Sequence, residues 1–245
     1  PPLERQTAIE LLHDAYNYDK QLKEPGQMLS SQPLTNQLKI ISCNVNGLGD
    51  RIKRGVVTQH LKRHSPDVAL LQETHMKGST FRALDRGGYC MKAHSGYTTG
   101  SRGVGILIRK QLPIILQRIH TDKHGRYAAI TGMWEGQTLY ILSIYIPPRL
   151  IESVLPEIGA LILSLPPGIL IAGGDYNAIM DRNLDRRPTR NTATTPLPLV
   201  GFAKAMGLAD LCRSHNPNAL QYTFHSGAHD SMSRIDHMLI HAHQI

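Results

Sequence analysis

The sequence predicts an α/β protein, with a mixed β-sheet core and helices outside it. From residue 38 onward, short apolar runs rich in β-branched residues alternate with segments of helical spacing. The chain has 245 residues, which suits one large domain with an extension. A composition of 41% hydrophobic and 19% charged residues excludes a wholly disordered, collagen-like or coiled-coil chain.

Each expected element has a local signal. The first strand, LKIISCNV, is a β-branched apolar run that ends at the turn pair Asn46-Gly47. Apolar residues recur at helical spacing in the helices, the last of which is expected to end near Gly207. We expect strands over 38–45, 67–74, 103–110, 128–134, 138–146, 169–177, 222–226 and 233–240, and helices over 55–64, 153–165 and 198–211.

Residues 1–37 differ from the rest and are expected to form an N-terminal extension. A stripe of apolar residues favours a short amphipathic helix, and 25–37 reads as a linker. The start PPLERQ has neither an initiator Met nor an apolar signal core, so we expect a fragment. The folded domain is expected over 38–245.

Composition and charge limit the classes of molecule that the protein is expected to bind. The net charge is +8, which favours a polyanion such as nucleic acid, an anionic membrane or polyphosphate without choosing among them. The apolar stretch 158–172 is interrupted by Pro166-Pro167 and is too short to span a bilayer. We expect no membrane among the partners. Three cysteines without a CxxC pair favour a reducing compartment. Three histidines gather near the C-terminus without finger spacing, so zinc is not expected.

Polar residues stand at the ends of otherwise apolar strands. Taken singly, each one can be a turn or cap residue. Taken together they are better explained by function, because α/β folds gather their ligand-binding groups just beyond the carboxyl ends of strands. These residues are Asn44, Asn46, Glu73, Tyr145, Asp175, Asn177 and Asp236.

Such a set suits phosphodiester hydrolysis. Glu73, helped by Asn44, can hold Mg²⁺ through oxygen ligands, and the metal would neutralise phosphate charge. Asp175 can position or deprotonate a water. Asn177 can donate hydrogen bonds to the charge-rich transition state.

Two further residues complete this hypothesis. Tyr145 can hydrogen-bond a phosphate oxygen. Asp236 can orient a histidine that lies near it in space.

Eight motifs in register resemble the exonuclease–endonuclease–phosphatase superfamily. Within it, the chain is most similar to the apurinic-type endonuclease domain of LINE-like non-LTR retrotransposons. Inositol polyphosphate phosphatases carry a different motif at SRIDHM, and base-excision endonucleases follow the glutamate with Thr-Lys rather than Thr74-His75. The motifs are ISCNVNGL (41–48), LLQETH (70–75), SRGVGILI (101–108), SIYIPP (143–148), IAGGDYNAIMD (171–181), LDR (184–186), YTFHS (222–226) and SRIDHM (233–238).

The resemblance implies a DNase I-like, four-layer α-β-β-α sandwich of two mixed sheets. It implies a Mg²⁺-dependent endonuclease, with Mn²⁺ able to substitute, that nicks one strand of double-stranded DNA. The 3′-hydroxyl left at the nick would prime reverse transcription by a reverse transcriptase domain of the parent polyprotein. Such a domain would act in the nucleus.

The resemblance also assigns residues. It puts Asn44 and Glu73 at the metal, Tyr145 on phosphate, Asp175 on the nucleophile and Asn177 on transition-state charge. The loop 227–232 resembles a hairpin that enters DNA and would influence target choice. Expected DNA contacts are Asn46, His75, Arg186, Thr223, Ser233 and Arg234.

One departure bears on activity. Relatives carry a Ser-Asp-His motif beyond the IDH motif, whereas this sequence ends nine residues after Asp236 (245 − 236) and holds no Ser-Asp-His. We therefore expect the last strand of the sandwich to be missing and catalysis to be severely impaired. Two alternatives stay open: a non-catalytic DNA-binding remnant of a retroelement, and a phosphomonoesterase of the same fold.

Overall fold

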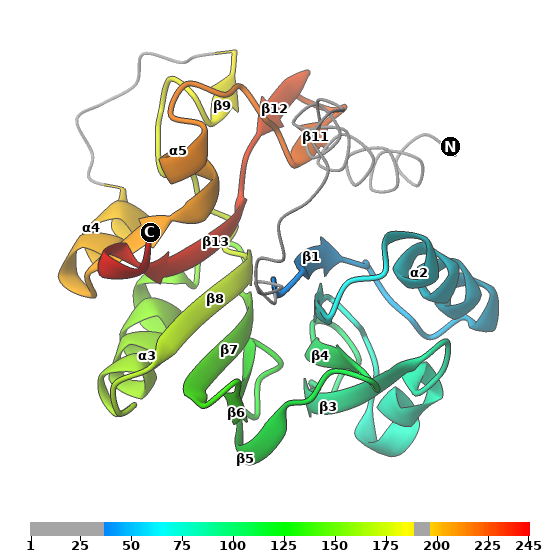
Figure 1. Ribbon diagram of the computed structural model, residues 1–245. Helices are drawn as coiled ribbons and strands as arrows, with labels where there is room; N and C mark the ends of the chain where they lie inside the picture. The colour runs from blue at the N-terminus through cyan, green and yellow to red at the C-terminus, as the bar shows by residue number, and fades with distance from the viewer. Residues whose placement is uncertain (1–36, 189–196) are drawn as a thin grey trace, which may run out of the picture.

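The computed structural model describes residues 37–188 and 197–245, and its centre is a pair of β-sheets (Figure 1). One sheet has four strands. In spatial order they are β1 (Ile40–Asn44), β2 (Val68–Gln72), β4 (Val104–Arg109) and β3 (Tyr89–Ser95). The first pair is parallel and the others are antiparallel.

The other large sheet has six strands and is also mixed, because only its β7 and β8 run parallel. Its order is β10 (Leu208–Asp210), β13 (Asp236–His241), β8 (Ile169–Asp175), β7 (Gln137–Tyr145), β6 (Tyr127–Trp134) and β5 (Ile115–Thr121). A small third sheet contains β11 (Phe224–Ser226), β12 (Ser231–Ser233) and β9 (Arg186–Arg187).

The helices are short. They are α2 (Arg51–His64), α3 (Ile151–Leu163), α4 (Pro198–Ala205) and α5 (Leu211–His215), with 3₁₀ turns η1 (Gly78–Leu84) and η2 (Ala242–Gln244). No helix in the described ranges is long and apolar enough to cross a membrane.

Three apolar clusters define the layers. The inner one joins the facing sheets, with Leu70 and Ile106 from the first packing among Ile130 and Ile141 from the second. Because both faces of the central strands are covered, β2 is buried along its whole length and its sequence is not alternating.

The two outer clusters attach the helices. Leu61 of α2 packs in one cluster with Leu107 of β4. On the other side, Ile158 of α3 and Ala203 of α4 pack in a cluster with Leu142 of β7. The order helix, sheet, sheet, helix confirms the expected four-layer sandwich (Figure 1).

A glycine pair explains how the sheets approach each other at β8. A Cβ on Gly173 would lie 2.6 Å from the sulfur of Met238 and 2.7 Å from a methyl of Leu70 in the opposite sheet. Gly174 has φ +153°, and a Cβ there would lie 1.9 Å from the carbonyl oxygen of Ile144. Gly173 therefore lets the two sheets pack closely, and Gly174 lets β8 pair with β7 up to the strand end that carries Asp175.

Most expected elements are confirmed, and two are corrected. The helix ends at Ala205, close to Gly207 as expected, because Gly207 adopts φ +63°; the rest of the segment 198–211 is corrected, because the chain then enters β10. The strand expected over 222–226 begins only at Phe224. Strands β3, β5, β9, β10 and β12 were not expected. Apart from Gln37, the extension expected over 1–37 lies outside the described residues.

Candidate active site

The polar strand ends meet at one edge of the two sheets. Asn44 ends β1, and Glu73 directly follows β2, which is parallel to it. In the second sheet, Tyr145 and Asp175 are register partners at the ends of the parallel strands β7 and β8. Asp236, at the start of antiparallel β13, lies opposite Asp175. The topology thus gathers residues that are far apart in the sequence.

Asn44 links the two sheets across this edge. Its amide nitrogen donates to Glu73 Oε1 and to Asp175 Oδ2, both at 2.9 Å. Its amide oxygen accepts from the backbone N–H of Asn46 at 3.0 Å. That oxygen is therefore engaged away from the carboxylates. The side chain of Asn44 is thus a donor that holds two carboxylates together. Its role as a metal ligand stays a prediction.

Negative charge accumulates at the edge. Residues directly opposite each other in antiparallel strands have Cβ atoms about 5 Å apart, which brings Asp175 and Asp236 together. Burial raises the pKa of Asp175, and the nearby Glu73 adds to the rise against hydrogen bonds from Asn44 and Asn177. Burial raises the pKa of Asp236, and the charge of Asp175 raises it further. Both shifts mean that the surrounding residues do not fully compensate the ionised carboxylates, so each carboxyl binds a proton more readily than a free aspartate does.

This donor set fits a hard divalent cation. Carboxylate oxygens are the ligands that Mg²⁺ prefers, and Mg²⁺ usually binds through one or two of them while keeping several waters. The described residues hold no group of three or more His, Cys, Asp or Glu side chains in a ready coordination arrangement. The edge therefore suits an open site, with Glu73 as the expected ligand, rather than a closed structural site.

Tyr145 supplies a proton donor beside the carboxylates. Its ring is buried, with 8% of the residue exposed. Burial raises the pKa of Tyr145, and the charges of Glu73 and Asp175 raise it further. The phenol therefore stays protonated at neutral pH.

Asn177 braces the strand end. Its backbone N–H donates to Asp175 Oδ1 at 2.9 Å, and its side-chain nitrogen donates to the carbonyl of Ile146 at 2.9 Å. The structure thus fixes Asn177 next to Asp175. Its role at the transition state stays a prediction.

The backbone is strained around the site. Asn46, Glu73, His75 and Asn177 have φ of +41°, +50°, +53° and +48°, which is left-handed backbone that costs non-glycine residues free energy. They are four of the nine such residues in the described ranges. His75 Nε2 lies 3.3 Å from Glu73 Oε2. Strain of this kind concentrates where surrounding contacts hold functional groups in place.

The expected DNA contacts divide into two groups. Asn46 and Arg186 are exposed, and Ser233 is the register partner of Arg186 in the small third sheet. Thr223 instead accepts from the backbone N–H groups of Ile235 and Asp236 at 3.1 and 3.2 Å. Its hydroxyl also hydrogen-bonds the Asp236 carboxylate. Thr223 therefore positions Asp236.

Arg234 is not a surface contact, which corrects the expectation. Only 2% of the residue is exposed. Its guanidinium pairs with Asp185 Oδ1 at 2.8 Å and with Asp210 Oδ2 at 2.6 Å. Asp210 also lies 3.1 Å from Nδ1 of His237, whose side chain is on the opposite face of β13 from Asp236. This buried network anchors the strand that carries Asp236.

Asp185 and Asp210 were not singled out by sequence analysis. Asp185 lies in the LDR motif, where only the arginine was noticed, and it accepts hydrogen bonds from the backbone of Met180 and Asp181. Asp210 caps α5 through the N–H of Cys212. The sequence offered one signal: these acidic residues occur in the same chain as the arginine of the SRIDH motif, which could pair with them.

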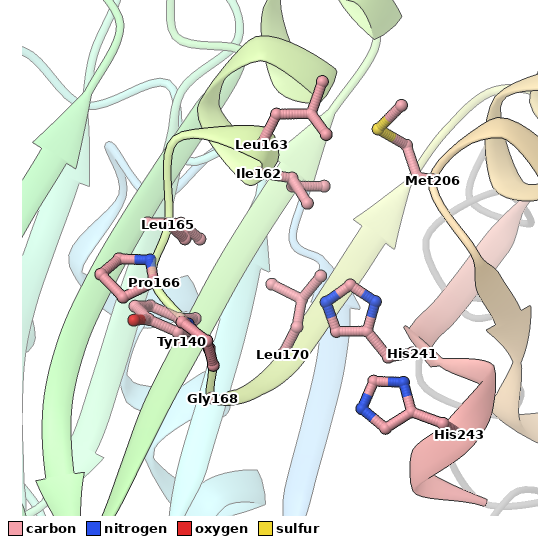
Figure 2. A pocket seen from close by; sticks show the side chains of 11 residues that line it. Tyr140, Ile162, Leu163, Leu165, Pro166, Gly168, Leu170, Met206, His241 and His243 are labelled. Carbon is pink, nitrogen blue, oxygen red and sulfur yellow. The ribbon is translucent and has the colours of Figure 1, made fainter.

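A pocket lies away from this edge. Figure 2 shows His241 and His243 beside Leu170 and Met206. The two imidazole rings are stacked, with centroids 5.3 Å apart. Since Leu170 and Asp175 are five residues apart along β8, the pocket lies roughly 16 Å from the carboxylates. Neither histidine takes part in the candidate site.

The geometry agrees with a sequence match that covers most of the chain. Residues 41–244 match the Endonuclease/Exonuclease/phosphatase family. The chain belongs to this family. A DNA-(apurinic or apyrimidinic site) endonuclease of Dictyostelium discoideum is 32% identical over 113 residues, which are 46% of this chain and 31% of that relative. The chain therefore matches about a third of the length of this relative.

Several solved structures share the fold. An AP endonuclease from Leishmania major has a TM-score of 0.66 at 16% identity, over 83% of this chain and 79% of that one. An AP endonuclease from Archaeoglobus fulgidus has a TM-score of 0.64 at 20% identity, over 84% and 87%. The endonuclease domain of TRAS1, a telomere-specific non-LTR retrotransposon, has a TM-score of 0.61 at 18% identity, over 84% and 85%. These likenesses establish the DNase I-like sandwich.

Proposed function

We propose that this domain is a Mg²⁺-dependent endonuclease that cuts one strand of double-stranded DNA. The observation that carries the proposal is the convergence of Glu73, Asp175 and Asp236 at one sheet edge, linked by Asn44 and lined by protonated Tyr145. The name of the Dictyostelium relative, a DNA endonuclease, supports it. A net charge of +8 suits a polyanionic substrate.

Each residue has a task in this reaction. Bound Mg²⁺, or Mn²⁺ in its place, would supply neutralisation of phosphate charge, and Glu73 would hold it. Asp175 accepts the proton of the attacking water, the bond between phosphorus and the 3′ oxygen breaks, and the leaving 3′ oxygen takes a proton from solvent. Tyr145 donates a hydrogen bond to a phosphate oxygen, and Asn177 stabilises the charge that develops on it. Asn44 keeps Glu73 and Asp175 in fixed relation.

A finer proposal concerns the biological setting. We infer a retrotransposon-type nick that leaves a 3′-hydroxyl, used as primer by a reverse transcriptase domain of the parent protein in the nucleus. The motifs around Glu73 and Asp236 and the likeness to the TRAS1 domain support this setting. The exposed hairpin at 227–232 would influence the choice of target. An unchanged cleavage pattern after that hairpin is exchanged would contradict this role.

Nicking of supercoiled plasmid tests the proposed function. With Mg²⁺ we expect open-circle product that vanishes with EDTA, and nicks that a DNA polymerase extends without prior end treatment. Product ends that need phosphatase treatment would refute the 3′-hydroxyl. Salt-sensitive DNA binding without product would select the non-catalytic DNA-binding alternative. Release of inorganic phosphate from a terminal monoester, with plasmid untouched, would select the phosphomonoesterase.

A further inference from the structure

Beside the carboxylates, four backbone hydrogen bonds join three loops into one wall. His75 N–H donates to the carbonyl of Arg102 at 2.7 Å, and Thr74 N–H donates to that of Gly103 at 2.9 Å. Gly103 N–H donates to Gly125 at 3.1 Å, and Tyr145 N–H donates to Arg126 at 2.7 Å. Arg102 is thus held between the segment that carries Glu73 and the end of β7.

The side chain of Arg102 is held by an aromatic ring. Its guanidinium carbon lies 4.8 Å from the ring centroid of Tyr97. The ring of the exposed His124 is tilted against the Tyr97 ring, with centroids 6.3 Å apart. Stacking on an aromatic face orients a guanidinium while leaving its N–H groups free to bind oxygen atoms.

The charge of Arg102 is not neutralised by an acidic partner. Within 37–188 and 197–245, it forms no ion pair with a carboxylate, whereas Arg126, Arg213 and Arg234 each do. It is only partly buried. Its positive charge acts on the Tyr145 hydroxyl, where it opposes the rise in pKa that burial and Glu73 cause. A fixed, unpaired arginine at the rim of an acidic centre suits an anionic group that the centre itself would repel.

We propose that Arg102, presented by Tyr97, binds a backbone phosphate of the cleaved strand next to the phosphodiester that is cut. The guanidinium matches the phosphate oxygens through two N–H groups. This subsite gives affinity and register on the strand and carries no sequence choice. The inference rests on the proposed function, because the neighbouring phosphate belongs to the same DNA strand.

DNA binding without cleavage tests the subsite. The affinity for a labelled duplex is measured in EDTA at several salt concentrations for the wild type, Arg102→Gln and Arg102→Lys. Arg86→Gln is the matched control, because Arg86 is exposed and precedes β3 at the opposite end of the first sheet. We expect Arg102→Gln to weaken binding several-fold and to lower the salt slope by about 0.9, which is one phosphate contact. Arg102→Lys should recover the slope in part, and Arg86→Gln should match the wild type.

Two further measurements separate binding from structure. Tyr97→Phe keeps the aromatic face and should bind like the wild type, whereas Tyr97→Leu should bind like Arg102→Gln. In the nicking assay, Arg102→Gln should raise KM with kcat within about twofold of the wild type, as expected for uniform binding. Unfolding midpoints of the variants equal to the wild-type value would show that the fold is kept.

The outcomes are distinct from those for the proposed function. Wild-type affinity and slope in Arg102→Gln would overturn the subsite, even with nicking intact. A loss of kcat without a change in KM would also overturn it. If Asp175→Asn nicks like the wild type while Arg102→Gln binds weakly, the proposed nuclease centre fails. The contact of Arg102 with a DNA phosphate then stands, but its place next to the cut phosphodiester is refuted. If the wild type does not bind DNA, both are refuted.

Discussion

Replacement of Arg234 by Met should strongly destabilise the fold, although the residue lies outside the carboxylate edge. The Arg234 guanidinium pairs with Asp185 at 2.8 Å and with Asp210 at 2.6 Å, and the side chains of these acids are 0% and 5% exposed. Without it, Asp185 keeps Arg213 at 2.6 Å and Asp210 keeps only His237 at 3.1 Å among ionisable partners. Removal of one partner from a buried ion pair costs about 3–5 kcal/mol.

Urea unfolding at pH 7 measures this cost, and its pH dependence gives a second test. Arg234 and His237 hold the pKa of Asp210 below its usual range against the effect of burial. A depressed folded pKa stabilises the protein above the unfolded pKa, and that stability is lost as pH falls through the folded value. In Arg234→Met the lowering is weakened, so the stability difference between variant and wild type should shrink as pH falls below 4.

The double variant Asp210→Asn with Arg234→Met is the internal control. It removes the uncompensated charge together with its partner, so it should be more stable than Arg234→Met alone. A cost below about 1 kcal/mol for Arg234→Met at pH 7 would refute the network as an anchor. A cost that grows as pH falls would refute its electrostatic origin.

The other predictions concern single positions. Burial lowers the pKa of His94 from 6.5 to about 4. Its contribution to the free energy of unfolding is therefore present above pH 6.5 and is lost as pH falls from 6.5 to 4, by about 3 kcal/mol at most. His94→Gln should flatten the pH dependence of the unfolding free energy over that range, and a pH profile identical to that of the wild type would contradict this. Gly174→Ala should cost more than 2 kcal/mol (about the sum of strain and overlap) and reduce nicking. Gly136→Ala is its control, with φ +77° but nothing within 4 Å, and should cost about 1 kcal/mol; equal costs for the two would refute the overlap with Ile144. Asn44→Asp should lower the thermal unfolding midpoint in the absence of metal, because it adds a carboxylate between Glu73 and Asp175. An unchanged midpoint would be evidence against this link.

The predictable part of the fold follows from coverage of both strand faces. The strands β2, β4 and β7 read as continuous apolar runs because sheet or helix lies on each side. The site was predictable for a related reason. Each polar residue interrupts such a run at its end, and the topology carries those ends to one edge. The strand β5 is a mostly exposed edge strand, so its sequence ILQRIHT contains no continuous apolar run that would mark it as a strand.

The role of Arg234 could not be predicted, because sequence does not show which charges are buried. Its partner Asp185 is 49 residues away, and only the packing of β13 beside β10 and the loop after β8 brings the three groups together. The orientation of Asn44 was hidden for the same reason. Whether its oxygen or its nitrogen faces the carboxylates depends on the backbone N–H of Asn46, which the turn aims at the oxygen. Residue type predicted the place of these groups but not their partners.

The central claim is that the carboxylate edge is a phosphodiesterase centre. The most direct measurement is the rate of plasmid nicking in Mg²⁺ by Asp175→Asn, compared with the wild type and with Glu135→Gln. Glu135 is an exposed acid in the turn between β6 and β7, at the opposite end of β7 from Tyr145. Loss of a central member of a catalytic unit typically costs several orders of magnitude in rate. The account predicts that Asp175→Asn nicks at least about a hundredfold more slowly, while Glu135→Gln stays within a few-fold of the wild type. A wild-type rate in Asp175→Asn would contradict it.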